Sequence, residues 1–244
     1  MRVSSAITRA GNGGTGRRMP DAINAGRWDE LGLRLLSAII LGTAVLFVVY
    51  LGGLAFSATL VFFALIMVYE WDQLCEERHF GPNGIAHGIF TCGALFLVGA
   101  GLVGPALVVL LAGAASVAAL ALFLGRPVIW PVLGLVYVAL PCATAIWLRE
   151  QGAHGMSVVL WSLVIVWATD TGAYLFGKSI GGPRLAPRIS PKKTWAGLIG
   201  GTACGTLAGG AFAAITGLAS IVILAGLSFI LTFAAHAGDL GESA

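Results

Sequence analysis

The segment from residue 177 to residue 195 holds five cations and no acidic side chain. The cations are Lys178, Arg184, Arg188, Lys192 and Lys193. Glycines and prolines between them favour turns, and the hydroxyl groups of Ser190 and Thr194 add hydrogen-bond donors. Arginine binds phosphate oxygens in pairs, whereas lysine binds them as a point charge. The segment therefore predicts a loop that binds phosphate groups.

A positively charged loop that merely faces anionic lipid is the alternative interpretation of this segment. It accounts for scattered cations, but it gives no reason for the glycines, prolines and hydroxyl groups among them. The residues from Ser190 to Thr194 could also cap the helix that follows, whose N-terminus would then point its dipole at an anion.

Acidic residues lie on both sides of this segment. Asp170 is the carboxylate that we place inside a membrane span, where a charge costs about 3 kcal/mol or more unless it is paired or hydrated. We expect either a structural partner for a basic residue or a polar cavity open to the cytoplasm. Asp239 and Glu242 are three residues apart, so a helix would place them on one face. Such a pair beside a polyphosphate predicts a Mg²⁺ site.

The elements that must position these residues are membrane helices. The chain has 244 residues, of which 58% are hydrophobic and 10% charged, whereas soluble domains carry about 25% charged residues. Eight apolar stretches are near the length of about 20 residues that a span requires. They are residues 34–51, 54–69, 86–103, 105–124, 128–148, 156–176, 197–215 and 218–236. We therefore expect an all-α, polytopic membrane helix bundle.

Lysine and arginine set the orientation, because cytoplasmic loops are enriched in them. With a cytoplasmic N-terminus, all of the 14 lysines and arginines except Arg149 fall on the cytoplasmic side. Eight spans then return the C-terminus to the cytoplasm as well. Residues 1–28 are interpreted as a basic, disordered cytoplasmic tail without the pattern of a signal peptide, and residues 29–244 as one membrane domain.

Glycine recurs at every fourth position of the seventh span, at Gly197, Gly201, Gly205 and Gly209. Residues four apart lie on one face of a helix, and small residues there let a second helix approach closely. The pattern predicts a tightly packed helix directly after the cationic segment.

Four motifs carry a resemblance to a known family. They are Asp170-Thr171-Gly172-Ala173-Tyr174, Gly177-Lys178, the run from Leu185 to Trp195 that includes Ser190-Pro191-Lys192-Lys193-Thr194-Trp195, and Gly238-Asp239-Leu240-Gly241-Glu242-Ser243. In order, spacing and surrounding hydropathy, the chain from about residue 30 onward resembles the bacterial phosphatidate cytidylyltransferases, also called CDP-diacylglycerol synthases.

The resemblance implies a multi-pass enzyme of the bacterial inner membrane, usually a homodimer, which acts among membrane lipids and has no nucleic-acid partner. It implies that CTP and phosphatidate are joined to give CDP-diacylglycerol and pyrophosphate, with Mg²⁺ as cofactor. We expect catalytic roles for Asp170, Lys192, Lys193 and Asp239, and metal binding by Asp239 and Glu242. The residues expected to bind the substrates are Lys178, Arg184, Arg188, Ser190, Thr194 and Ser243.

The family signature continues beyond the position of Ser243 with further cations and an acidic metal ligand, whereas this sequence ends at Ala244. We therefore expect a C-terminally truncated domain. The alternative functions are a transporter of an anionic substrate, an inactive truncated membrane remnant, and a lipid kinase or a cytidylyltransferase that acts on another lipid.

Overall fold

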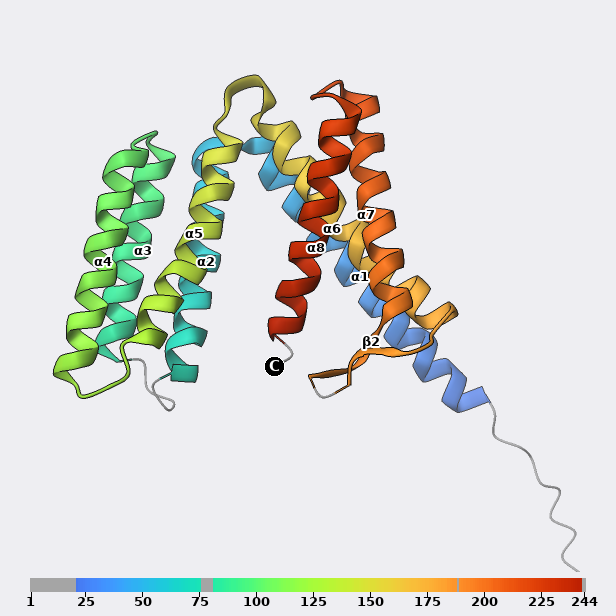
Figure 1. Cartoon of the computed structure of the whole chain (residues 1–244), viewed down its shortest axis with the longest axis horizontal. Coiled ribbons are helices and arrows are strands. Elements are labelled where there is room, and N and C mark those ends of the chain that lie inside the picture. Colours follow the sequence, from blue (N-terminus) through green and yellow to red (C-terminus); the bar gives the residue numbers. More distant parts are fainter. Residues whose placement is uncertain (1–20, 76–80, 188, 243–244) are drawn as a thin grey trace, which may run out of the picture. The chain divides into compact units, whose positions relative to one another are not determined.

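The structure is a computed structural model that describes residues 21–75, 81–187 and 189–242 (Figure 1). Within these residues it has eight helices and one two-stranded antiparallel sheet. The elements are α1 (Asp21–Leu51), α2 (Gly53–Cys75), α3 (Pro82–Gly99), α4 (Val103–Phe123), α5 (Ile129–Arg149), α6 (Gly152–Ser179), β1 (Arg184–Ala186), β2 (Ser190–Thr194), α7 (Trp195–Thr216) and α8 (Ile221–Glu242).

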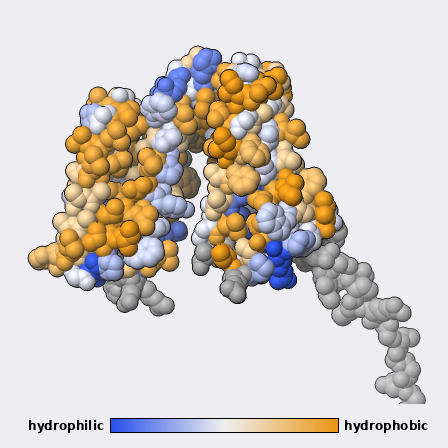
Figure 2. All heavy atoms as spheres, viewed as in Figure 1, coloured by the Kyte–Doolittle hydropathy of each residue, from blue (hydrophilic) through white to orange (hydrophobic). Residues whose placement is uncertain are grey.

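Seven of the described helices, α2 to α8, are long and apolar enough to cross a membrane. Helix α1 adds a shorter apolar stretch, Leu36–Leu51. Large apolar side chains on these helices are exposed, and Figure 2 shows them covering the sides of the helices on the visible face. A bilayer is the solvent that such a surface requires. The prediction of an all-α, multi-pass membrane protein is confirmed.

The chain divides into two compact units, residues 1–45 and residues 46–244. In the second unit, α2, α3, α4 and α5 pack against one another, and α6, α7 and α8 form a second set of mutually packed helices. Helix α5 also contacts α6. The motifs of the sequence lie on the second set and on the strands between α6 and α7.

The glycine ridge of α7 faces α6, as the sequence predicts. A Cβ atom added to Gly197 would lie 2.9 Å from the carbonyl oxygen of Ala173, and one added to Gly201 would lie 2.8 Å from that of Thr169. Further along, Gly209 faces Ser228 of α8. Helix α7 is therefore held close to both neighbours, which fixes the position of its N-terminus.

Two details of the sequence prediction are wrong. The segment from residue 177 to residue 195 is not a simple loop, because α6 continues to Ser179 and the strands β1 and β2 follow. Asp170 is also not alone inside a span: Asp72 lies in α2, and Asp239 lies in α8. Asp72 is buried, and its Oδ2 accepts a hydrogen bond of 2.9 Å from the backbone N–H of Gly81.

Candidate active site

A glycine turn leads the chain from α6 into the hairpin. Gly181 and Gly182 have φ angles of +64° and +94°, in a region that favours glycine because it lacks a Cβ atom. Arg184 of β1 then pairs with Thr194 of β2, and Ala186 pairs with Ser190. Of the cations in the segment, Arg184 thus lies on β1, and Lys192 and Lys193 lie on β2 directly before α7.

Thr194 caps the N-terminus of α7. Its Oγ1 accepts a hydrogen bond of 3.1 Å from the backbone N–H of Gly197, which satisfies one of the four N–H groups that a helix leaves unpaired at this end. Because β2 ends directly at this cap, Lys192 and Lys193 lie immediately before the positive end of the helix dipole. Anions bind favourably at such an end.

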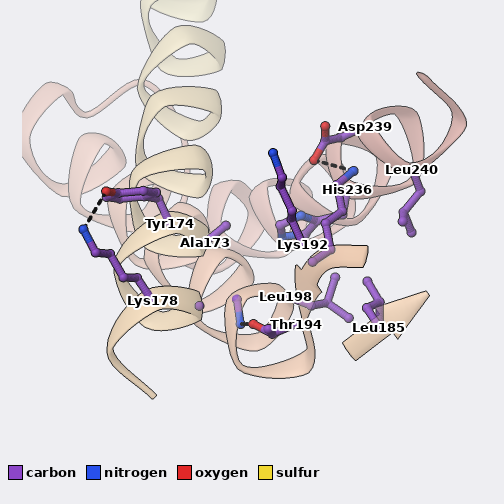
Figure 3. Close-up of a pocket in the computed structure, with 13 residues that line it drawn as sticks. Ala173, Tyr174, Lys178, Leu185, Lys192, Thr194, Leu198, His236, Asp239 and Leu240 are labelled. Atoms are coloured by element: carbon purple, nitrogen blue, oxygen red, sulfur yellow. Dashed lines mark hydrogen bonds and ion pairs between the residues drawn. The ribbon is translucent and has the colours of Figure 1, made fainter. Parts of the chain in front are cut away.

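A cavity of about 500 Å³ lies between α6, the hairpin, the start of α7 and the end of α8 (Figure 3). Lys178, Lys192 and Lys193 line it together with Thr194 and Asp239. The other lining residues are Ala173, Tyr174, Gly177, Leu185, Gly197, Leu198, His236 and Leu240. The cavity therefore combines three cations with one carboxylate at the ends of three apolar helices.

An ion pair joins two of these groups across the cavity. Nζ of Lys193 lies 2.7 Å from Oδ2 of Asp239, and the two side chains are 23% and 62% exposed. Lys178 lies on the other side, where its Nζ donates a hydrogen bond of 3.1 Å to the hydroxyl oxygen of Tyr174. Figure 3 shows the hydrogen bond between Lys178 and Tyr174 as a dashed line, and a second dashed line ends on Asp239. In this arrangement Lys193 neutralises Asp239, while Lys178 is held in the last turn of α6.

Asp170 belongs to the electrostatic surroundings of the cavity. It is exposed on α6, near enough to Asp239 and His236 of α8 for their charges to act on its carboxylate. Two carboxylates that repel each other attract a cation, and oxygen ligands are the ones that Mg²⁺ prefers. Among the described residues no three His, Cys, Asp or Glu side chains form a metal-binding group. Asp239 lines the cavity and Asp170 does not, so the described residues offer Mg²⁺ one carboxylate in the cavity and a second near it, and phosphate oxygens and water would have to complete the ligand set.

The other predicted residues lie differently. Arg184 is exposed on β1 and is not among the described residues that line the cavity, and Ser190 is buried in the hairpin. Glu242 belongs to the last turn of α8, but its side chain lies outside what the structure describes. Arg188 and Ser243 lie outside the described residues.

Sequence reasoning gave no functional role to two polar residues of the cavity, Tyr174 of the Asp170–Tyr174 motif and His236, which it interpreted as a packed interface residue. Tyr174 holds Lys178, and the spacing of four residues within one helix is a signal that could have found this pair. His236 lies one turn before Asp239 on α8, and its imidazole interacts with both Asp170 and Asp239. His236 and Asp239 are three residues apart, as Asp239 and Glu242 are, so the same spacing could have predicted that His236 and Asp239 share a helix face.

Comparison with known proteins identifies the family. The model of the cytidylyltransferase family matches residues 32–244. A phosphatidate cytidylyltransferase of Brucella melitensis is 34% identical over 234 residues, which cover 88% of this chain and 79% of the relative. One of Brucella suis is 34% identical over 231 residues with the same coverage. One of Staphylococcus aureus is 42% identical over 95 residues, or 38% of this chain and 36% of the relative. The chain belongs to the cytidylyltransferase family.

Proposed function

We propose that this protein transfers the cytidylyl group of CTP to phosphatidate and forms CDP-diacylglycerol and pyrophosphate. The observation that carries the proposal is the cavity in which Lys178, Lys192 and Lys193 face Asp239 at the ends of membrane helices. Both substrates carry phosphate groups that such a cavity could bind: CTP would enter it from water and phosphatidate from the bilayer. The relatives from Brucella melitensis and Staphylococcus aureus bear the name of this activity.

In the reaction, a phosphate oxygen of phosphatidate attacks the α-phosphorus of CTP, the bond from that phosphorus to the β-phosphate bridging oxygen breaks, and pyrophosphate leaves. No protein nucleophile is needed, because positioning and charge stabilisation supply most of the catalysis in phosphoryl-type transfer. Lys192 and Lys193, before the N-terminus of α7, bind the phosphates of CTP. Lys193 also binds the phosphate of the lipid, and Lys178, at the end of α6, adds a third cation to the same cavity.

The acidic residues have a separate part in the proposal. Asp239 and Asp170 would hold Mg²⁺, with Glu242 as a further ligand. When bound, Mg²⁺ supplies neutralising charge for the triphosphate. The charges of both carboxylates act on His236. Arg184, Arg188, Ser190 and Ser243 remain candidates for contacts with the substrates outside the part of the cavity described above.

The cellular setting follows from the same proposal. The cationic hairpin lies on the cytoplasmic side, since lysine and arginine are enriched there, and CTP reaches it from the cytoplasm. The membrane is then the inner membrane of a bacterium, and the resemblance to the family adds a homodimer among membrane lipids.

The test uses the purified protein in detergent with dioleoyl phosphatidate, Mg²⁺ and CTP labelled at its α-phosphate. We expect labelled CDP-diacylglycerol from the unchanged chain. Asp239→Asn should lower kcat on the order of 100-fold, the usual effect of losing one charge-stabilising group. Glu150→Gln, an exposed acid between α5 and α6, is the matched control and should keep full activity. Equal activity of the two variants would contradict the proposed site.

A further inference from the structure

A second cavity, of about 580 Å³, lies along α7 and α8 beside the candidate active site. Its walls are apolar: Phe229 and Phe233 come from α8, and Ile199 and Leu207 come from α7. The two phenylalanine rings contact each other with their centroids 5.8 Å apart. We call this cavity the α7–α8 groove. Its apolar walls suit hydrocarbon chains rather than a nucleotide.

The groove adjoins the cationic cavity. Leu198 lines both, so one side chain separates the place proposed for phosphates from the apolar walls. From Leu198 to Thr202 is one turn of α7, about 6 Å at 1.5 Å per residue. A lipid whose phosphate lies beside Lys193 would therefore have its glycerol beside Leu198 and its acyl chains in the groove.

Thr202 adds a polar group at the depth where ester groups would lie. It lines the groove, and its side chain is buried, with 8% exposed. Its Oγ1 has no hydrogen-bond partner among the described residues. A threonine in a helix commonly bonds to the carbonyl oxygen four residues earlier, as Thr169 does to Ile165 at 2.8 Å. Because an unpaired buried hydroxyl is costly, an acceptor from a ligand that reached the buried Oγ1 of Thr202 would relieve that cost.

We infer that the α7–α8 groove binds the diacylglycerol part of phosphatidate, with the Thr202 hydroxyl donating a hydrogen bond to an ester carbonyl oxygen. This inference rests on the proposed function and assigns the lipid half of that site. A second copy of the chain or unspecific bilayer lipid could also cover an apolar groove. Phosphatidate is favoured because it has both apolar chains for the groove and a phosphate for the cavity that shares Leu198 with it.

The first experiment measures binding without turnover. Dioleoyl phosphatidate with a diazirine in one acyl chain is photolysed with the full-length protein in detergent, and labelled residues are mapped by mass spectrometry. We expect labels on α7 and α8 near Ile199 and Phe229, which excess unlabelled phosphatidate removes. Labels spread over all helices would overturn the inference. Specific labels in the groove without any CDP-diacylglycerol formation would instead contradict the proposed function and leave the groove as a phosphatidate site.

The second experiment fills the groove. Ala203→Trp places a large ring among its lining residues, whereas Ala211→Trp makes the same change at an exposed position of α7 outside the residues that line the groove. For Ala203→Trp we expect KM for dioleoyl phosphatidate to rise about tenfold, which corresponds to about 1.4 kcal/mol. KM for CTP and turnover of water-soluble dihexanoyl phosphatidate should stay within about twofold of the unchanged chain.

Ala211→Trp should change none of these values. A rise that is equal for both chain lengths would overturn the inference, as would a change of oligomeric state in Ala203→Trp with unaltered KM, because the groove would then bind a second copy.

The third experiment tests the hydroxyl of Thr202. Thr202→Val keeps the shape of the side chain and removes the donor. The unchanged chain should bind ester-linked phosphatidate about threefold to tenfold more tightly than the ether-linked analogue, which lacks the carbonyl oxygens, and Thr202→Val should abolish this preference. A preference that persists in Thr202→Val would overturn the assigned hydrogen bond. Because the comparison is made within each variant, a general loss of folded protein does not imitate the expected result.

Discussion

Nζ of Lys193 lies 2.7 Å from Oδ2 of Asp239, so a cation of the hairpin after α6 neutralises the acid of the last turns of α8. Figure 1 shows the hairpin and the end of α8 at the same end of these helices. Because Asp239 is largely exposed, such a pair contributes about 1 kcal/mol or less to stability. The pair matters for metal binding, because the ammonium group of Lys193 contacts the carboxylate that we propose as a ligand of the divalent cation.

Lys193 should therefore compete with a divalent cation for Asp239. In Lys193→Met the carboxylate is free of this ammonium, and we expect the affinity for Mn²⁺, measured by the electron paramagnetic resonance signal of free Mn²⁺ without CTP, to rise about threefold to tenfold. An interaction of about 1 kcal/mol corresponds to this range. With CTP present, the same variant should bind nucleotide more weakly, because a phosphate-binding cation is lost.

Lys178→Met is the matched control for this prediction. It removes a cation from the same cavity, but one whose Nζ bonds to Tyr174 rather than to Asp239. Its Mn²⁺ affinity should change less than that of Lys193→Met. Equal changes in the two variants would mean that general charge in the cavity, not the ion pair, governs metal binding.

Thr194 was expected to bind substrate, and the structure gives its Oγ1 a hydrogen bond from Gly197 as the cap of α7. Thr194→Ala should cost about 1 kcal/mol of stability, which lowers Tm by about 2–4 °C in a chain of this size. Thr194→Ser keeps the acceptor oxygen and should leave Tm unchanged. Thermal unfolding in detergent measures both. If Thr194→Ser loses as much stability as Thr194→Ala, the methyl group rather than the cap is what matters.

The helices and the chemistry of the site could be predicted from sequence for different reasons. Hydropathy identifies membrane spans directly, and the sequence analysis predicts a span for each of α2 to α8. The match to the cytidylyltransferase family confirms the resemblance. The cations of residues 177–195 stand out because they are concentrated in an otherwise apolar chain. Both signals are local, and neither requires knowledge of how distant segments meet.

The hairpin and the ends of the helices could not be predicted in the same way. The two strands have only three and five residues. Gly181 and Gly182 precede them and Pro191 lies in β2, so their composition is that of a loop. Helix α2 continues past its apolar stretch to Cys75, and in this last part Asp72 is buried and accepts a hydrogen bond from the N–H of Gly81. Such ends depend on partners from elsewhere in the chain, which hydropathy does not report.

The close packing of α7 makes Gly201 intolerant of a larger side chain. An added Cβ would lie 2.8 Å from the carbonyl oxygen of Thr169 and 3.0 Å from the Cβ of Ala173, so Gly201→Ala must push α6 away. We expect a loss of about 1–3 kcal/mol, the usual cost of overpacking, together with a higher KM for CTP because the N-terminus of α7 moves. Thermal unfolding and steady-state kinetics measure the two effects.

Gly210 provides the control in the same helix. Its added Cβ would lie 3.6 Å from that of Ala225 and 3.9 Å from Cγ2 of Ile221, which is ordinary contact. Gly210→Ala should therefore be neutral or slightly stabilising, since alanine favours a helix over glycine by about 1 kcal/mol. A loss of stability equal to that of Gly201→Ala would show that close approach to α6 is not the cause.

Arg149 closes the C-terminal turn of α1. Its Nε donates to the carbonyl oxygen of Val49 at 2.8 Å, and one of its Nη atoms donates to that of Tyr50 at 3.2 Å. These carbonyl groups have no partner within their own helix once it ends, and a cation there also complements the helix dipole. Arg149→Ala should lower the free energy of unfolding by about 1–3 kcal/mol, with Arg149→Lys between it and the unchanged chain.

Two neighbouring glycines separate this contact from backbone strain. Gly52 and Gly53 have φ angles of +60° and +50°, so an alanine at either position is strained by about 1–2 kcal/mol. A Cβ added at Gly52 would collide with the guanidinium group of Arg149, whereas one added at Gly53 meets no described atom within 4 Å. Gly52→Ala should therefore destabilise the protein more than Gly53→Ala in thermal unfolding, and the difference should vanish when both are made in Arg149→Ala. If Gly52→Ala still destabilises the protein more than Gly53→Ala in the Arg149→Ala background, backbone strain explains the difference, and the contact with Arg149 does not.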